Sequence, residues 1–262
     1  MISQSRVLTP NPLALLRGVP RFTVFCLMIC LFLLHHFIAG LLFQDEIKRL
    51  SYFMKSIQRT CQLGLRLLGI EVETQGSVPK GSGGRLLIAN HLSYVDVLVL
   101  FSRYPSLFVT SVEMGEVPVL GMIAKFAGCF FVERRKFKRS AEGLDKEIRS
   151  MNEKLQAGFD VFLFPEGTSS DGRTVLPFKA TFFQTALDCN VPLVPLCVKY
   201  SVGVNVIPWY GEMTFPRHLF MLCMSSGLKA RVVQLDTVQP YGDRYQLSGL
   251  CHGLIKEEYA RN

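Results

Sequence analysis

The chain has 262 residues, enough for one sizeable domain and an additional segment but not for two full domains. Apolar residues make up 49% of it and include 20 phenylalanines, a composition that indicates contact with a membrane. Most of the net charge of +8 lies in residues 1–70, which hold eight Lys or Arg against two acids, whereas residues 71–262 are nearly balanced. This placement, around a hydrophobic segment, favours anionic lipid headgroups over a nucleic-acid partner.

The N-terminal region predicts membrane-associated helices. Residues 22–43 carry no charge apart from the pair His35 and His36, and the run is long enough to span a hydrocarbon core. An amphipathic helix is predicted over 45–69, with its apolar positions at helical spacing: Leu50, Phe53, Ile57, Cys61, Leu65 and Leu68. Basic residues flank the hydrophobic run on both sides, so a simple span and a hairpin with one embedded and one interfacial helix both remain open. We expect residues 1–70 to form this segment and residues 71–262 to form the catalytic domain.

Short strands and helices alternate in the rest of the chain. Strands are predicted over 71–73, 86–89, 107–111, 129–132, 160–164 and 192–199, and helices over 95–101, 119–126, 140–157, 178–187 and 246–259. A Gly- and Ser-rich loop over 77–84 precedes them. The alternation predicts an α/β fold with a mainly parallel sheet flanked by helices, with ligands bound beyond the carboxyl ends of the strands.

The eight cysteines include no Cys-x-x-Cys pair, and several lie inside apolar runs. This pattern indicates buried free thiols in a reducing compartment, with no disulfide framework and no metal site.

A polar block, residues 90–96, follows the apolar strand 86–89 and contains His91 and Asp96. Positions i and i+5 lie about 140° apart on a straight helix, so the two side chains can meet only if His91 sits on the turn and Asp96 on the helix that follows. A carboxylate held against one ring nitrogen would make the imidazole an oriented general base. Taken alone, the pattern is more typical of a capping or surface histidine and a solvated aspartate than of a catalytic pair, so a second block is needed to support the catalytic interpretation.

A second polar block, residues 164–168, follows the strand 160–164, and parallel strands would bring both blocks to one edge of the sheet. The strand ending near Val132 would deliver Arg134 to the same edge. Backbone amides and a hydroxyl around Gly167 and Thr168, with a guanidinium nearby, form a site suited to an anionic headgroup.

These blocks resemble the glycerol-3-phosphate / 1-acylglycerol-3-phosphate acyltransferase family, a group of membrane-bound lysolipid acyltransferases. The family's Asn-His-x-Ser-x-x-Asp block, which contains its His-x4-Asp motif, matches residues 90–96. The Gly-x-x-Phe-Val strand followed by an acid and an arginine matches 128–134, Phe-Pro-Glu-Gly-Thr matches 164–168, and Val-Pro-x-Val-Pro matches 191–195. The resemblance covers roughly residues 72–199.

The resemblance implies transfer of a fatty acyl group from acyl-CoA or acyl-carrier protein to the free hydroxyl of a lysolipid. His91 would take the hydroxyl proton while Asp96 fixes the imidazole tautomer. The residues implied in substrate binding are Asn90, Ser93, Arg134, Glu166, Gly167, Thr168 and Arg173. No metal and no cofactor beyond the thioester co-substrate are expected, and an apolar tunnel near the membrane should take the acyl chain. The family's donors place the catalytic domain at the cytoplasmic face of a bacterial inner membrane. The basic run 134–139 is typical of a solvated charged surface, and for its last three residues contact with lipid headgroups or the carrier protein is an equal alternative.

One departure from the family pattern leaves the acceptor open. Members that use phosphate-bearing acceptors usually continue with arginine, where this chain has Ser169, and the run 169–179 resembles members that acylate lyso-ornithine lipid. Arg173 or Lys179 could replace the missing charge. The leading acceptor is 1-acyl-glycerol-3-phosphate, giving phosphatidic acid for phospholipid biosynthesis, and lyso-ornithine lipid is the alternative.

Other classes of protein fit less well. A catalytically silent lipid-binding protein of the same fold is a further possibility, against which the intact His91 and Asp96 argue. No Gly-x-Ser-x-Gly elbow of a serine lipase and no phosphate-binding loop of a kinase occurs in the sequence. His218 and His252 have no partner block, so the sequence assigns them no role.

Overall fold

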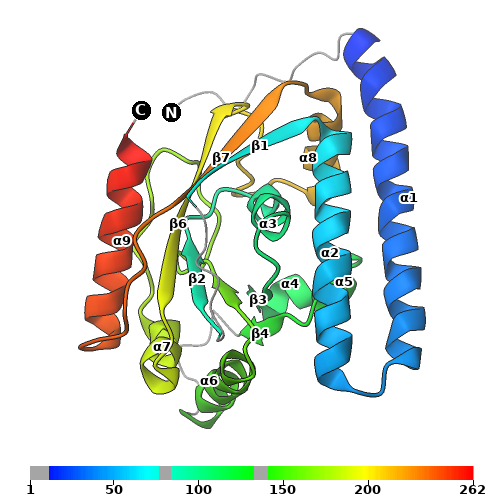
Figure 1. The fold of residues 1–262 in the computed structure, drawn as a ribbon. Helices are drawn as coiled ribbons and strands as arrows, with labels where there is room; N and C mark the ends of the chain where they lie inside the picture. The colour runs from blue at the N-terminus through cyan, green and yellow to red at the C-terminus, as the bar shows by residue number, and fades with distance from the viewer. Residues whose placement is uncertain (1–11, 77–83, 133–140, 262) are drawn as a thin grey trace.

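The computed structural model describes residues 12–76, 84–132 and 141–261, with side chains placed throughout except for residues 141–145. These residues form a seven-stranded sheet in the order β1-β7-β6-β2-β5-β3-β4 (Figure 1). Its strands are β1 (Ile70–Gln75), β2 (Leu86–Ala89), β3 (Leu107–Ser111), β4 (Phe130–Val132), β5 (Val161–Leu163), β6 (Leu193–Val202) and β7 (Leu228–Gln234). Every pairing is parallel except that of β6 with β7, which confirms the predicted mainly parallel α/β fold.

Helices cover both faces of the sheet. They are α1 (Pro12–Leu42), α2 (Glu46–Leu68), α3 (Tyr94–Phe101), α4 (Val112–Glu116), α5 (Leu120–Phe126), α6 (Ala141–Gln156), the 3-10 turn η1 (Thr181–Phe183), α7 (Gln184–Cys189), α8 (Phe215–Met224) and α9 (Arg244–Ala260). Figure 1 shows α1 and α2 as an antiparallel hairpin along one side of the molecule, with α9 along the other.

The central strand β2 shows why both faces need cover. All four of its residues are buried, and they alternate between two cores. Leu87 packs with residues of the hairpin, α3 and α8, whereas Leu86 packs with residues of α6, α7 and α9. A continuous apolar strand is what a parallel sheet covered on both faces requires.

The hydrophobic helix starts earlier than its hydropathy predicts. The sequence places its start at residue 22, but α1 begins at Pro12 and includes Arg21. The additional turns pack against α8, where a Cβ added to Gly18 would come within 2.5 Å of Met224 Cγ. The Arg21 guanidinium donates a 2.8 Å hydrogen bond to the carbonyl of Ser225, which caps α8. Because the C-terminus of α8 stabilises the Arg21 charge, α1 can include this residue. A hydropathy profile cannot detect such a contact between distant parts of the chain.

The amphipathic helix matches its predicted bounds. Asp45 is the N-cap of α2, with its side chain accepting from the amide of Lys48, and Gly69 ends the helix in the left-handed region at φ +69°. The predicted domain boundary between residues 70 and 71 lies inside β1, after its first residue. The hairpin nevertheless shares a core with the sheet, because Phe25 of α1 belongs to the same packed cluster as Leu87 of β2.

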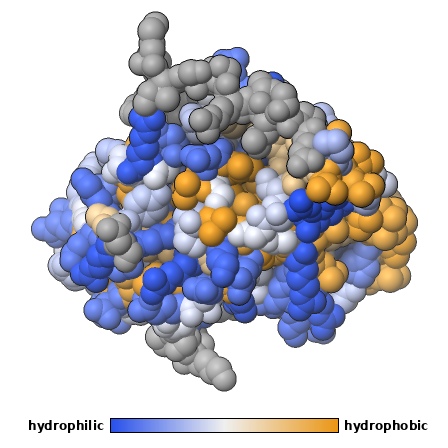
Figure 2. Space-filling model, turned by 90° about the horizontal axis from the view of Figure 1, so that it is seen from above, coloured by the Kyte–Doolittle hydropathy of each residue, from blue (hydrophilic) through white to orange (hydrophobic). Residues whose placement is uncertain are grey.

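The outer face of α1 is strongly apolar. Among the described helices, α1 has the length and composition needed to cross a membrane. In Figure 2 hydrophobic residues gather on the side of the molecule where α1 lies. The outward side chains include Leu13, Leu16, Val19, Val24, Leu27, Leu31, Leu34, Phe37, Ile38, Leu41 and Leu42. A patch of this kind indicates association with a membrane.

Several elements differ from the sequence-based prediction. The helix predicted over 178–187 is the turn η1 followed by the short α7, because the amide of Lys179 bonds instead to the carbonyl of Pro165. α4 and α8 were not predicted. All eight cysteines are free thiols, but Cys30 is exposed on α1, so burial holds for only some of them.

Candidate active site

The turn between β2 and α3 brings His91 and Asp96 together. α3 begins at Tyr94, so Asp96 lies in its first turn and His91 lies on the connection before it. The distance from His91 Nδ1 to Asp96 Oδ2 is 3.0 Å. The ring of Phe164 stacks on the imidazole, with centroids 4.0 Å apart and planes 12° apart. The carboxylate and the aromatic ring fix the imidazole plane and leave Nε2 as the nitrogen available to a substrate.

Asp96 is completely buried and is surrounded by donors. Its Oδ2 accepts from the amides of Leu92 at 2.6 Å and Ser93 at 2.9 Å, in addition to His91. Its Oδ1 accepts from the hydroxyl of Tyr200, on β6, at 2.6 Å. These hydrogen bonds offset the cost of burying a carboxylate and hold it in one orientation. Tyr200 was not predicted, since nothing in the sequence pairs it with a residue more than a hundred positions earlier.

Glu166 acts on the histidine turn rather than facing a ligand. Its Oε1 accepts from the amide of His91 at 2.8 Å, and its Oε2 accepts from the amide of Leu176 at 3.1 Å. The residue is only 4% exposed, and burial raises the pKa of its carboxyl to about 7, against the opposing effect of the two amides. These contacts tie the second block to the first, in place of the headgroup contact expected from the sequence.

Asn90 and Ser93 also make backbone contacts where substrate contacts were expected. The Asn90 amide exchanges two hydrogen bonds with the backbone of Val198, donating to its carbonyl at 2.9 Å and accepting from its amide at 2.8 Å. The Ser93 side chain caps α3 in a capping box with Asp96. Both side chains are buried, so they fix the turn that carries His91.

The cationic residues predicted to bind the headgroup, Arg173 and Lys179, do not lie together in the structure. Arg173 is exposed, pairs with Asp171 at 3.3 Å and lines a neighbouring cavity of about 340 Å³ that does not include His91. Lys179 lies against the second block, because a Cβ added to Gly167 would come within 2.7 Å of its Nζ. Gly167 has φ +72°, a conformation that favours glycine, and its lack of a side chain leaves room for Lys179. Arg134 lies outside the described residues.

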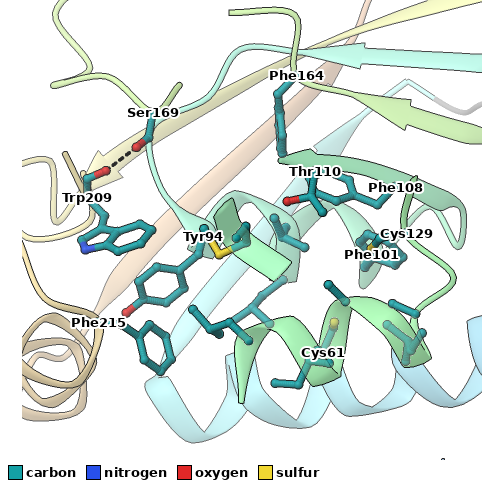
Figure 3. Close-up of a pocket in the computed structure, with 18 of the residues that line it drawn as sticks. Cys61, Tyr94, Phe101, Phe108, Thr110, Cys129, Phe164, Ser169, Trp209 and Phe215 are labelled. Carbon is teal, nitrogen blue, oxygen red and sulfur yellow. Dashed lines mark hydrogen bonds between the residues drawn. The ribbon is translucent and has the colours of Figure 1, made fainter. Parts of the chain in front are cut away.

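A largely apolar cavity of about 430 Å³ opens beside His91, and we call it the reaction cavity. Its walls come from α1, α2, α3, β3, α4 and α5, together with the segment 209–215. Figure 3 shows Ser169, Trp209, Tyr94 and Phe215 on one side of the cavity and Phe101, Phe108 and Cys129 on the other. Exposed Thr168 also lines it. An apolar cavity therefore lies beside His91, and its occupation by an acyl chain stays a prediction.

The side chain of Tyr94 links the wall of the reaction cavity to α8. Its hydroxyl lies 2.9 Å from His218 Nδ1, and His218 Nε2 lies 2.8 Å from the carbonyl of Val206. A carbonyl can only accept, so Nε2 carries the proton and Nδ1 accepts from Tyr94. Burial lowers the pKa of His218, which keeps it neutral. His218 therefore has a structural partner that its sequence neighbours did not indicate.

Ser169, the position where an arginine is missing, is tied to the wall of the cavity. Its hydroxyl donates to the carbonyl of Trp209, drawn as the dashed line in Figure 3. Within residues 12–76, 84–132 and 141–261, no group of His, Cys, Asp or Glu side chains is placed to hold a metal ion.

Comparison with known proteins finds acyltransferases that are similar to this chain in sequence and in structure. A family model described as Acyltransferase matches residues 69–199. The 1-acyl-sn-glycerol-3-phosphate acyltransferase of Neisseria meningitidis is 32% identical over 188 residues, which cover 70% of this chain and 72% of that protein. The lyso-ornithine lipid O-acyltransferase of Rhodobacter capsulatus is 29% identical over 210 residues, covering 75% of this chain and 72% of that protein. The crystal structure of the 1-acyl-sn-glycerophosphate acyltransferase PlsC from Thermotoga maritima shares the fold, with a TM-score of 0.69 and 19% identity over 95% of this chain and 99% of that one.

Proposed function

Because the chain belongs to the acyltransferase family, we propose that it moves a fatty acyl group from a thioester donor to the free hydroxyl of a lysolipid. The observation that carries this proposal is the His91–Asp96 pair, with His91 on the wall of an apolar cavity. A catalytically silent protein would have no need of a buried carboxylate held by several donors against an imidazole.

The reaction follows from the orientation of the ring. His91 Nε2 takes the proton of the lysolipid hydroxyl as its oxygen attacks the thioester carbonyl. Asp96 holds the proton on Nδ1 and stabilises the imidazolium that forms. Collapse of the tetrahedral intermediate breaks the carbon–sulfur bond, and the imidazolium returns its proton to the leaving thiolate. No acyl-enzyme is needed, and burial raises the pKa of Cys129 in the cavity wall to about 12, which keeps that thiol unreactive.

The leading acceptor is 1-acyl-glycerol-3-phosphate. The Lys179 ammonium beside Gly167 supports an anionic headgroup at the second block, and Arg134 remains a predicted partner of the phosphate. Lyso-ornithine lipid is the second candidate, supported by the relatives that use it and by Ser169, whose hydroxyl is bonded to the protein. The donor is acyl-CoA or acyl-carrier protein, at the cytoplasmic face of a bacterial inner membrane.

The test is acyl transfer by washed membranes that contain the protein. Each acceptor is offered separately with acyl-CoA and with acyl-carrier protein, for the wild type and for His91→Ala. Loss of a general base should lower the rate by about 10²–10⁴-fold. His252→Ala removes an imidazole from α9 and should leave the rate unchanged.

The outcomes separate the two acceptors. Acylation of lysophosphatidate that is lost in His91→Ala identifies a phosphatidate-forming enzyme. If only lyso-ornithine lipid is acylated, serine in place of arginine at position 169 indicates which acceptor the enzyme uses. If neither acceptor reacts faster than in His91→Ala, the role given to His91 is wrong.

A further inference from the structure

A second hollow lies between the two helices of the hairpin. This hairpin groove has a volume of about 650 Å³ and is lined by Val24, Leu27, Met28, Leu31, Phe32, His35, Tyr52, Lys55, Ser56, Arg59, Thr60 and Leu63. It opens outward, since Leu27 and Leu31 are more than half exposed. Only Met28, Phe32 and Thr60 also line the reaction cavity, so the groove is a separate site one side chain away from it.

The two walls of the hairpin groove differ in chemistry. With the exception of His35, α1 contributes only apolar side chains. In contrast, α2 contributes hydroxyl groups and two cations, Lys55 and Arg59, and only one aliphatic side chain. A groove with one apolar wall and one polar, cationic wall is complementary to an amphiphile that has an apolar chain and an anionic headgroup.

The two cations are available to a ligand. Lys55 and Arg59 are both exposed and lie four residues apart, on the same face of α2. Within the described part of the chain neither has an acidic partner. The acids at the start of α2 are engaged elsewhere: Asp45 pairs with Lys48, and Glu46 pairs with Lys154 of α6.

We propose that the hairpin groove binds an anionic phospholipid of the bilayer. Its phosphate lies between Lys55 and Arg59, and an acyl chain lies along Leu27 and Leu31 of α1. Charge complementarity selects the headgroup, and the exposed apolar wall selects a lipid over a soluble anion. A lipid bound there would hold together the two helices that wall the reaction cavity, so binding should stabilise the protein.

The test uses the full chain purified in neutral detergent and a readout that does not depend on catalysis. Thermal unfolding is followed during titration with phosphatidylglycerol, phosphatidylcholine or inorganic phosphate. Phosphatidylglycerol should raise the midpoint, and the other two should not. Lys55→Gln/Arg59→Gln should weaken the apparent affinity for phosphatidylglycerol by about tenfold.

A matched pair separates this site from general attraction to a charged surface. Lys48→Gln/Arg66→Gln removes the same two types of charge from α2 outside the groove and should leave the affinity close to that of the wild type. Lys55→Arg/Arg59→Lys, which keeps both charges, should also bind like the wild type. The proposal is overturned if both glutamine pairs weaken binding equally, if phosphatidylcholine stabilises as well as phosphatidylglycerol, or if inorganic phosphate alone gives the full shift.

Discussion

Tyr200, on the central strand β6, contacts His91 indirectly, through a hydrogen bond to Asp96. Its hydroxyl donates to Asp96 Oδ1, whereas the other donors to Asp96 belong to the histidine turn itself. Tyr200 does not line the reaction cavity, so it cannot contact a substrate there. We therefore regard it as a positioning residue that acts through Asp96.

Tyr200→Phe should lower kcat by about tenfold or more, because a hydrogen bond to a charged group contributes about 1.5–3 kcal/mol. KM should stay close to the wild-type value. With one donor fewer, the Asp96 carboxylate stabilises the His91 imidazolium more strongly, so the substitution should raise the pKa of His91. The acid limb of the pH–rate profile should therefore move to higher pH. A lower melting temperature with unchanged kcat and pH profile would instead assign Tyr200 a purely structural role.

The buried carboxyl of Glu166 should make stability depend on pH. Its pKa is raised from an ordinary value of 4.5 to about 7, so the folded protein holds a proton that the unfolded chain has already lost. This contribution is fully present below about pH 4.5 and is lost as the pH rises to about 7, at a cost of up to about 3 kcal/mol. Glu166→Gln, which has no proton to lose, should flatten the dependence.

The measurement is the free energy of unfolding in neutral detergent at several pH values between 4.5 and 8. The exposed residue Glu212 offers a control, since Glu212→Gln should keep the wild-type slope. An equal slope in Glu166→Gln and wild type would mean that another group carries the dependence.

At the scale of elements, Arg21 connects the hairpin to the end of α8. Besides its bond to the carbonyl of Ser225, its guanidinium lies close to Gly69, where α2 ends. Arg21→Ala should lower the free energy of unfolding by about 1–2 kcal/mol and speed hydrogen exchange at the end of α8. Arg17→Ala removes the same charge one turn earlier and should have a smaller effect. Equal effects would mean that charge alone, not the cap, matters.

Elements defined by short apolar runs could be predicted from the sequence. β2 and β3 match their predicted bounds, because a buried strand between polar turns leaves a sharp local pattern. α8 could not be predicted, since its burial depends on α1, which lies some two hundred residues away along the chain. The start of α1 could not be predicted for the same reason.

The site divides in a similar way. His91 and Asp96 could be paired from the sequence because the turn that joins them is local. The contacts of Glu166, Asn90 and Tyr200 depend on neighbouring strands, so sequence reasoning gave the first two a ligand instead of a backbone partner and did not single out the third.

At the scale of the whole molecule, the hairpin is both the apolar outer face and a wall of the reaction cavity. α1 presents exposed leucines on one side and Phe25 and Phe32 to the cavity on the other. An acyl chain in the cavity would therefore be one helix away from the apolar surface, and the hairpin groove lies between these two places.

The pairing of β1 with β7 joins two parts of the chain that are synthesised at different times. β1 follows the hairpin directly, yet its partner β7 spans Leu228–Gln234. At a synthesis rate of about 5–20 residues per second, the ribosome needs roughly ten to thirty seconds to make that partner. β1 therefore leaves the ribosome well before its partner, so neither of its edges has a strand to pair with until β7 has been made.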